Sequence, residues 1–406
     1  MTQAVDPISD QSEYRAEVQR WLAANGTPRS ADDLWAVNIH ASDEAQRAAF
    51  DRGVAWQRKL AAAGYAGITW PTDYGGQGGA RWKERVFGEE AAQVEESGGF
   101  ITATIAMLGP TLLQHGTDDQ KQRFLPGLIS GDLTFCQLFS EPSAGSDLAS
   151  LATSATRDGD EFIVCGQKVW NSAAQHCDWA FLLARTDPTQ PKHRGITFFL
   201  VDMASAGIEV RPLIQMNGAR HFNEVFLSDV RVPVNQVVGA VDEGWTAART
   251  VLGNESSFIG RSGGASLVTS ALELTRLHGR AADPVMRQRL AELWTRERLQ
   301  TAMGNRISSA VRAGRDVPID GALLKLYAAE TRRLLGNYVM EVAGATAMAG
   351  DEAPARWAQA QLAMRFSLSI GGGTNEVQRN NLAERSLGLP REPRTDRNVA
   401  WRDTLR

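Results

Sequence analysis

The spacing of apolar residues changes twice along the chain, and the order of the resulting segments constrains the fold more than any other feature. From residue 12 to about 132, apolar residues such as Phe50 and Val54 recur at helical spacing. Over residues 133–238, short apolar runs alternate with turn residues, and the helical period returns over 244–387. Helices followed by strands and again by helices predict an α+β fold. They argue against the alternating strands and helices of a Rossmann fold or a barrel.

These changes divide the chain into three predicted domains. An N-terminal all-α domain is expected over residues 1–132, and a middle antiparallel, barrel-like β-domain over 133–240. A C-terminal helical bundle is expected over 241–406. No internal repeat or low-complexity segment interrupts this order, so each domain is expected to bury a core of its own.

Local signals support these domains. The stretch Trp70–Gly79 contains four glycines and a proline, which exclude a regular helix and predict a loop. Asp158 and Gly159 favour a hairpin turn, while Asp283 and Pro284 are typical of the start of a helix. The predicted strands include Phe162–Val164, Phe181–Leu183, Ile196–Val201 and Val225–Leu227.

Composition excludes several classes of protein. With 43 Lys and Arg against 47 Asp and Glu, the net charge of −4 does not fit a non-specific nucleic-acid binder. The sequence has no run of 18 or more apolar residues, so no membrane span is predicted. Three cysteines are too few for a disulfide framework, which favours a reducing compartment, and we predict the cytoplasm. The run His176–Asp178 lacks a second ligand group at suitable spacing, so no metal site is predicted.

Two segments carry groups suited to a polar ligand. Gln137–Asp147 offers hydroxyls, a glycine and open backbone amides, which can hold an anionic ligand at close range. Gly166–Ser172 places the aromatic Trp170 before hydrogen-bonding side chains. Taken alone, the first segment also fits a tight capped loop, and Trp170 also fits a core position. Neither segment decides between a binding site and a structural turn.

The two segments occur together with three further motifs, and in this order the chain resembles the acyl-CoA dehydrogenase family. The further motifs are Phe222–Phe226, Gly244-Trp245 and Gly371–Asn380, the last reading Gly-Gly-Gly-Thr-Asn-Glu-Val-Gln-Arg-Asn. The resemblance covers residues 57–392. It implies an FAD-binding protein with an N-terminal helical domain, a middle β-domain and a C-terminal four-helix bundle, in agreement with the order found from texture.

The resemblance also implies roles for particular residues. Those expected against the flavin pyrimidine are Gln137, Leu138, Phe139 and Ser140. Those expected against the flavin itself are Trp170, Asn171 and Ser172, with Ser172 near the hydride-accepting N5. Those expected along the adenosine half of FAD are Thr374, Asn375 and Glu376. Ser146 is expected to contact a phosphate or the CoA arm, and the backbone amides near Gly372 and Gly373 are expected to hold the substrate enolate.

The family's reaction needs a base for the α-proton of the thioester. In many relatives a glutamate precedes the Gly-Thr pair of the C-terminal motif, but Gly372 stands at that place here. A second branch of the family, which includes isovaleryl and long-chain types, carries its glutamate on the first helix after the β-domain. Glu255 lies there and is the predicted base, although a lone glutamate on a helix is usually a solvated residue.

The resemblance implies FAD-dependent dehydrogenation of an acyl-CoA to the 2,3-enoyl-CoA in fatty acid or sterol side-chain β-oxidation. Electrons would pass to electron-transferring flavoprotein. The chain departs from the family pattern at Ser256, where relatives carry arginine, at residues 276–284, which lack Phe-Gly, and at Met340–Gly344. These departures leave open a homo- or hetero-oligomer, dimer or tetramer, with a related chain. They also leave open a catalytically silent or half-site subunit, and an oxygen-using flavin enzyme is a third alternative.

Overall fold

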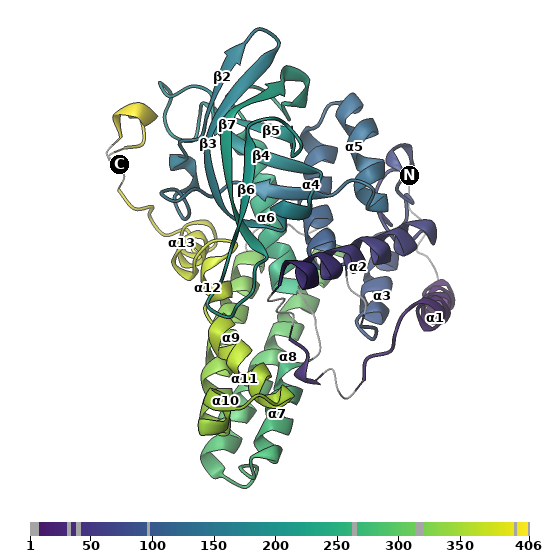
Figure 1. Ribbon diagram of the computed structural model, residues 1–406. Coiled ribbons are helices and arrows are strands. Elements are labelled where there is room, and N and C mark those ends of the chain that lie inside the picture. The colour runs from purple at the N-terminus through teal and green to yellow at the C-terminus, as the bar shows by residue number, and fades with distance from the viewer. Residues whose placement is uncertain are drawn as a thin grey trace.

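The computed structural model describes residues 8–30, 34–37, 42–95, 98–261, 266–312, 320–393 and 396–404. Along this part of the chain, helices come first, strands follow and helices return, as the texture predicted. In Figure 1 the strands lie at the top, the N-terminal helices lie beside them, and most of the C-terminal helices extend below. The α+β architecture is therefore confirmed, and the domain limits after residues 132 and 240 stay a prediction.

The N-terminal helices are α1 (Ile8–Asn25), α2 (Asp43–Ala62), α3 (Arg81–Ala91), α4 (Phe100–His115) and α5 (Asp118–Ser130). Caps explain where two of them begin. The Ser42 side chain accepts a hydrogen bond from the Ala45 N–H at the start of α2. Thr117 and Gln120 form a reciprocal capping box at the start of α5.

The predicted loop Trp70–Gly79 is confirmed, and its glycines have a steric reason. A Cβ on Gly76 would lie 2.3 Å from the Trp70 carbonyl oxygen. On the neighbouring helix α4, a Cβ on Gly109 would lie 1.9 Å from the Trp70 ring. The loop therefore folds tightly over α4, and Gly76 and Gly109 leave the space that Trp70 occupies.

The strands are β1 (Phe135–Leu138), β2 (Ser154–Asp158), β3 (Glu161–Ser172), β4 (Trp179–Arg185), β5 (Ile196–Asp202), β6 (Ile208–Leu213) and β7 (Phe222–Pro233). They form one sheet in the order β1-β4-β2-β3-β7-β6, with β5 paired to β4. The predicted hairpin joins β2 to β3, and Gly159 in its turn has a φ of 62°. Most pairs are antiparallel as predicted, whereas β1 and one position of β2 run parallel to β4.

The C-terminal helices are α6 (Trp245–Arg261), α7 (Leu267–Leu277), α8 (Pro284–Arg312), α9 (Asp320–Ala343), α10 (Ala345–Ala349), α11 (Ala353–Met364), α12 (Ser367–Ile370) and α13 (Asn375–Arg385). Helix α9 is the centre of this group because it packs against α6, α8, α11 and α13. The predicted start of α8 is confirmed, and Asp283 accepts hydrogen bonds from the N–H groups of Val285 and Met286. Short 3₁₀ turns lie at Thr72–Tyr74, Leu148–Ser150, Ala174–His176, Val234–Gln236 and Trp401–Asp403.

Helix α6 connects the sheet to the bundle. Its residues Ala247, Ala248 and Val251 are buried in the apolar cluster that joins the N-terminal helices to the sheet. The same helix packs against α4 and against α9. Helix α6 therefore lies where the N-terminal helices and the sheet meet the bundle.

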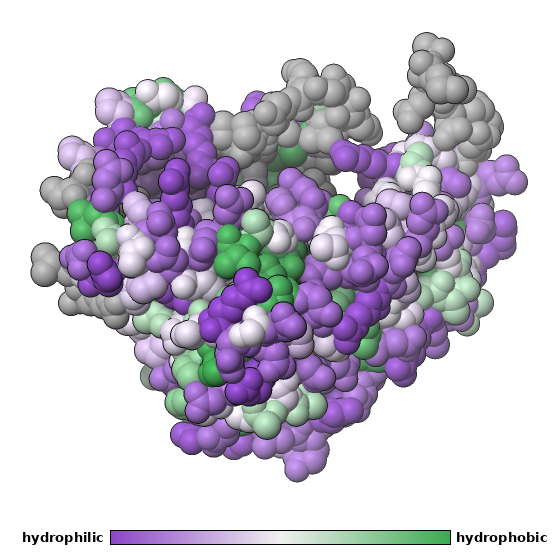
Figure 2. All heavy atoms as spheres, turned by 90° about the horizontal axis from the view of Figure 1, so that it is seen from above, coloured by the Kyte–Doolittle hydropathy of each residue, from purple (hydrophilic) through white to green (hydrophobic). Residues whose placement is uncertain are grey.

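The surface is not uniformly polar. The face seen from above in Figure 2 is mostly hydrophilic, with a compact hydrophobic area near its middle. Many large exposed apolar side chains lie on the C-terminal helices and their connections, namely Leu277, Val285, Trp294, Leu299, Met348, Met364, Phe366 and Ile370.

Candidate active site

Helix α6 carries Glu255 to the end of strand β1. Gly244 donates its N–H to the Ile196 carbonyl (2.7 Å), and a Cβ on this glycine would lie 2.3 Å from the Phe198 nitrogen. The helix therefore begins tightly against β5, where a glycine is required. About three turns further on, the Glu255 side chain is hydrogen-bonded to the Gln137 side chain. The predicted base and the first predicted flavin-facing residue thus lie together.

The surroundings of Glu255 favour its protonated form. Burial raises the pKa of the half-buried Glu255 above its ordinary value, and the Gln137 hydrogen bond and the Lys325 charge offset this only in part. A carboxylate that has lost solvation binds a proton more readily. This is the property that a general base requires.

The segment that follows β1, Gln137–Ser140, is fixed through its carbonyl groups. The three donors lie on β3: Asn171 Nδ2 donates to Gln137 O (2.7 Å), Lys168 Nζ to Phe139 O (3.0 Å) and the Val169 N–H to Ser140 O (2.9 Å). The side chains of Leu138 and Phe139 are buried in the core. For these two residues only the backbone can face a ligand, whereas the side chains of Gln137 and Ser140 are partly exposed.

An ion pair that the sequence analysis missed lies beneath this segment. The Nζ atom of the fully buried Lys168 lies 2.8 Å from Glu141 Oε1. Glu141 also accepts hydrogen bonds from the N–H groups of Ala152 (2.7 Å) and Thr153 (2.9 Å). Burial by itself raises the pKa of Glu141, but Lys168 and these donors lower it overall. The pair anchors the loop after β1 to strand β3.

A β-bulge separates the predicted flavin contacts on β3 into inward and outward positions. The register shifts between Val169 and Asn171, and Trp170 in between has a φ of 63°. Trp170 is 59% exposed, and its ring meets the Phe222 ring edge-on with the ring centres 5.9 Å apart. Asn171 is instead buried and supports Gln137, while Ser172 is half-buried. Trp170 and Ser172 are therefore open to a ligand, and Asn171 acts from behind.

The glycine motif before α13 forms a turn with left-handed backbone. Gly372 and Gly373 have φ values of 64° and 85°, which glycine adopts readily. Gln378 Nε2 donates to Gly372 O (2.9 Å), and Lys325 Nζ donates to Gly373 O. Thr374 uses its hydroxyl to cap α13 by accepting a hydrogen bond from the Val377 N–H.

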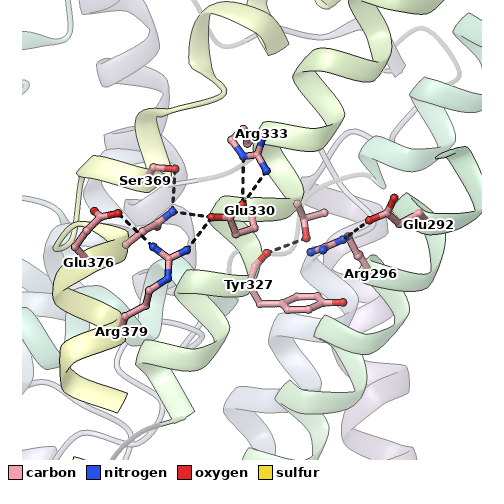
Figure 3. A network of polar contacts seen from close by, with 10 residues as sticks. Glu292, Arg296, Tyr327, Glu330, Arg333, Ser369, Glu376 and Arg379 are labelled. Atoms are coloured by element: carbon pink, nitrogen blue, oxygen red, sulfur yellow. Dashed lines mark hydrogen bonds and ion pairs between the residues drawn. The ribbon is translucent and has the colours of Figure 1, made fainter. Parts of the chain in front are cut away.

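A polar network holds the first turn of α13 against α9, as Figure 3 shows. Glu330 on α9 accepts hydrogen bonds from Asn375 Nδ2 (3.2 Å) and Arg379 Nη2 (3.3 Å), and also from Arg333 on its own helix. The Asn375 side chain is thus turned into the bundle. Glu376 is exposed and pairs with Arg379 at 3.2 Å.

Ser146 lies exposed in the loop after β1. Its neighbour Asp147 pairs with Lys192 at 2.8 Å, and Lys192 also pairs with Asp396 at 2.9 Å. These contacts hold the loop to the β4–β5 connection and to the C-terminal segment. They leave the Ser146 side chain exposed at the surface.

Two buried lysines are the site residues that sequence reasoning missed. Lys325 interrupts the apolar run Ala322–Ala329, and Lys168 occupies an inward position on β3. A single charge within an apolar face was the available signal, because an ionised group is buried only where a partner or a function compensates its lost solvation.

The described residues contain no helix long and apolar enough to cross a membrane. Over the same ranges, no group of three or more His, Cys, Asp or Glu side chains is arranged to hold a metal ion. Cys136, Cys165 and Cys177 are free thiols.

Comparison with known proteins matches the domains in the order found above. Sequence models of the acyl-CoA dehydrogenase N-terminal, middle and C-terminal domains match residues 9–132, 136–230 and 242–387. The chain belongs to the acyl-CoA dehydrogenase family. This acyl-CoA dehydrogenase is accordingly an oxidoreductase, and the three-domain fold implied by the resemblance is confirmed.

The chain is 37% identical over 391 residues to acyl-CoA dehydrogenase IpdE1 of Mycobacterium tuberculosis. The alignment covers 95% of this chain and 99% of the relative. Among solved structures, it matches the Tcur3481-Tcur3483 steroid ACAD G363A variant with a TM-score of 0.78 and 31% identity, over 95% of this chain and 100% of that one. It matches the ChsE4-ChsE5 complex from Mycobacterium tuberculosis with a TM-score of 0.75 and 30% identity, over 96% and 100%.

Proposed function

We propose that this chain catalyses FAD-dependent α,β-dehydrogenation of an acyl-CoA thioester and releases the 2,3-enoyl-CoA. The observation that carries the proposal is the contact between Glu255 and Gln137. It joins a desolvated carboxylate to the segment assigned to the flavin, so that a proton acceptor and the redox cofactor would face the same acyl chain. The chemistry that FAD supplies when bound is acceptance of the β-hydrogen as hydride.

The residues present fit FAD. The exposed indole of Trp170 offers a flat wall for the isoalloxazine ring, next to the half-buried Ser172. The Oδ1 atoms of Asn171 and Asn375 are buried without a hydrogen-bond partner among the described residues, and they lie on the two segments assigned to FAD. Trp170 and Ser172 would hold the flavin ring, and the side chains of Thr374–Glu376 would hold the adenosine half, which leaves the backbone N–H groups of the glycine turn to the substrate.

The chain's own groups divide the remaining work. Glu255 would take the α-proton onto its carboxylate, which its raised pKa favours. Backbone N–H groups of the turn at Gly372 and Gly373 would hold the thioester oxygen as negative charge develops there. Ser146, exposed at the surface, would contact the CoA arm at a distance from the reacting carbons.

A spectroscopic experiment tests this function. The visible spectrum of the purified protein is recorded alone and after anaerobic addition of short, branched and steroid-type acyl-CoAs. In Glu255→Gln we expect retained flavin absorbance and bleaching slowed by about 10²- to 10⁴-fold, because the amide cannot accept the α-proton. Glu209→Gln, which changes an exposed glutamate on β6 that pairs with Arg211, is the matched control. Unchanged bleaching in Glu255→Gln would remove Glu255 from this role.

We also propose a bulky, sterol-derived acyl group as the substrate, in the degradation of sterol side chains or fatty acids. One matched structure is described as a steroid ACAD. In this chain Gly372 replaces the glutamate of many relatives and leaves space beside the predicted acyl site. Bleaching by a steroid-type thioester and not by short straight chains is the expected result of the same panel.

A half-site subunit of a hetero-oligomer is the second candidate. Two matched structures are described as pairs of differently named proteins. Here Arg280, in the short connection between α7 and α8, binds its own chain through Glu341 O (2.8 Å) and Asp283 (2.9 Å). Its guanidinium group is therefore engaged within its own chain. Colourless protein when expressed alone, and yellow protein when expressed with a related chain, would establish this candidate over a homo-oligomer.

Electron-transferring flavoprotein is the proposed acceptor, and the cytoplasm is the proposed compartment on the basis of the low cysteine content. Substrate-reduced protein is mixed either with electron-transferring flavoprotein or with air-saturated buffer. Reoxidation by the flavoprotein supports the dehydrogenase. Rapid oxygen consumption without it would instead identify an oxygen-using enzyme on the same fold.

A further inference from the structure

Lys325 is a charged side chain buried at the site without a role in the function proposed so far. Its side chain is fully buried on α9, and its ammonium donates to the carbonyl oxygen of Gly373. Removing an ammonium from water is costly unless charged or polar groups compensate for the lost hydration. Its position facing the glycine turn therefore calls for an explanation.

The contact fixes the direction of a peptide group. In a planar trans peptide, the carbonyl of one residue and the N–H of the next point in opposite directions. Because Lys325 holds the Gly373 carbonyl, the Thr374 N–H is turned away from α9. Gln378 holds the Gly372 carbonyl in the same manner and turns away the Gly373 N–H. Two donors of the glycine turn thus point away from the side chains that hold their carbonyls.

Two carboxylates also act on this lysine through their charge. They belong to Glu255 on α6 and Glu376 on α13, and both raise the pKa of Lys325. Burial lowers the pKa more strongly, to about 8, so that near neutral pH the ammonium is charged but close to its titration range. In return, the positive charge lowers the pKa of Glu255. The lysine thus interacts with both the glycine turn and the base.

We propose that Lys325 is a positioning residue for the dehydrogenation, which orients the turn Gly372–Thr374 toward the thioester oxygen and holds Glu255 as a carboxylate. The proposal rests on the proposed function for its reaction, whereas its two structural consequences can be measured in the ligand-free chain. It distinguishes Lys325 from a lysine that only fills space in the bundle.

The first test uses ligand-free protein and measures the midpoint of thermal unfolding against pH. Because Glu255 has a raised pKa in the folded state, the unfolded chain ionises first as pH rises above 4.5, and folded wild type loses stability until its own carboxyl ionises. Glu255→Gln removes this loss, so the difference between its unfolding midpoint and that of wild type grows with pH and then becomes constant. When both proteins also carry Lys325→Met, we expect the pH at which this difference becomes constant to rise by about one unit.

The second test uses the flavin-loaded protein. Lys325→Met is expected to lower kcat by about 10- to 100-fold with KM changed by less than about threefold, because the oriented N–H groups act mainly in the transition state. The acidic limb of kcat/KM should move to higher pH. Lys325→Gln, which keeps a donor without the charge, should restore part of kcat but leave the acidic limb displaced.

Tyr338→Phe is the matched control, since it removes a buried hydrogen bond to Thr275 (2.7 Å) further along the same helix. It should change neither the pH profile nor kcat. The proposal would be overturned if Lys325→Met and Tyr338→Phe lost the same amount of kcat, and if Lys325→Met shifted neither the acidic limb of kcat/KM nor the pH at which the difference in unfolding midpoint becomes constant. A shifted stability curve in a chain that bleaches with no acyl-CoA would keep the effect of Lys325 on Glu255 and overturn the proposed function instead.

If Lys325→Met does not fold, hydrogen exchange of the wild-type protein tests whether Lys325 orders the glycine turn. Amide protection in peptides covering residues 371–377, corrected for intrinsic exchange, is expected to fall between about pH 7 and pH 9 as Lys325 loses its proton. Constant protection over this range would overturn the proposal.

Discussion

Lys168 in the sheet and Lys325 in the bundle are both fully buried, yet their surroundings differ. Lys168 forms a direct ion pair with Glu141 at 2.8 Å and donates to the Phe139 carbonyl at 3.0 Å. Lys325 donates to the carbonyl of Gly373 and meets the carboxylates of Glu255 and Glu376 through charge alone. Burial lowers the pKa of both lysines, and Lys168 has its counter-charge in hydrogen-bond contact.

This difference separates the two sides of the candidate site. On the sheet side, Glu141 has its charge balanced by Lys168 and by the N–H groups of Ala152 and Thr153, so the backbone assigned to the flavin is fixed in advance. On the bundle side, the pKa of Glu255 is raised, that of Lys325 is lowered, and the charge of each group acts on the other. One side is built to stay rigid, and the other carries a lysine whose pKa is lowered to about 8 beside a carboxyl group whose pKa is raised.

Breaking the ion pair of the sheet should give the largest effect. Lys168→Met leaves Glu141 as a buried charge without its partner and is expected to cost about 3–5 kcal/mol of unfolding free energy. Urea unfolding of the ligand-free chain measures this cost. The double change Lys168→Met with Glu141→Met should recover much of the loss, because an apolar pair needs no counter-charge. A cost below about 1 kcal/mol in the single variant would contradict the picture of a rigid sheet side.

Lys325 in the bundle should instead affect how the unfolding free energy changes with pH in alkaline solution. Its pKa in the folded chain is about 8, below the ordinary 10.5, so the unfolded chain binds more protons between these values. Stability therefore rises with pH across this window, by up to about 3 kcal/mol. Lys325→Met should remove the contribution of Lys325 to this rise. Denaturant unfolding at several pH values measures the slope, and an identical slope in Lys325→Met would contradict the assignment.

The sequence predicted the parts of the fold that depend on local signals. The order of helices and strands, the hairpin at Asp158-Gly159, the loop at Trp70–Gly79 and the start of α8 at Pro284 are all confirmed. Each follows from periodicity or from the backbone limits of glycine and proline. The parallel pairing of β1 with β4 was not predicted, because strand direction depends on contacts between distant segments.

Local sequence signals could not predict which side chains of the site point inward and which point outward. The motif marked Trp170, Asn171 and Ser172 together, but the bulge after Val169 breaks the alternation and turns Asn171 inward beside an exposed Trp170. Leu138 likewise belongs to the motif while its side chain belongs to the core. A motif therefore locates a segment, and the assignment of each residue to a ligand stays a prediction until its side chain is tested.

The smallest stability effect is expected at the bulge itself, where neighbouring residues allow a direct contrast. Trp170→Gly relieves a left-handed backbone of φ 63° but loses the contact with Phe222, so the ligand-free chain should change by less than about 1 kcal/mol. Asn171→Ala, the control one residue along, leaves the Gln137 carbonyl without its donor and should cost about 1–3 kcal/mol. Flavin affinity, measured by equilibrium dialysis, should instead fall about tenfold in Trp170→Gly because the aromatic wall is lost. If Trp170→Gly loses more stability than Asn171→Ala, the indole is part of the core, and the outward direction assigned to it as a ligand-facing wall is wrong.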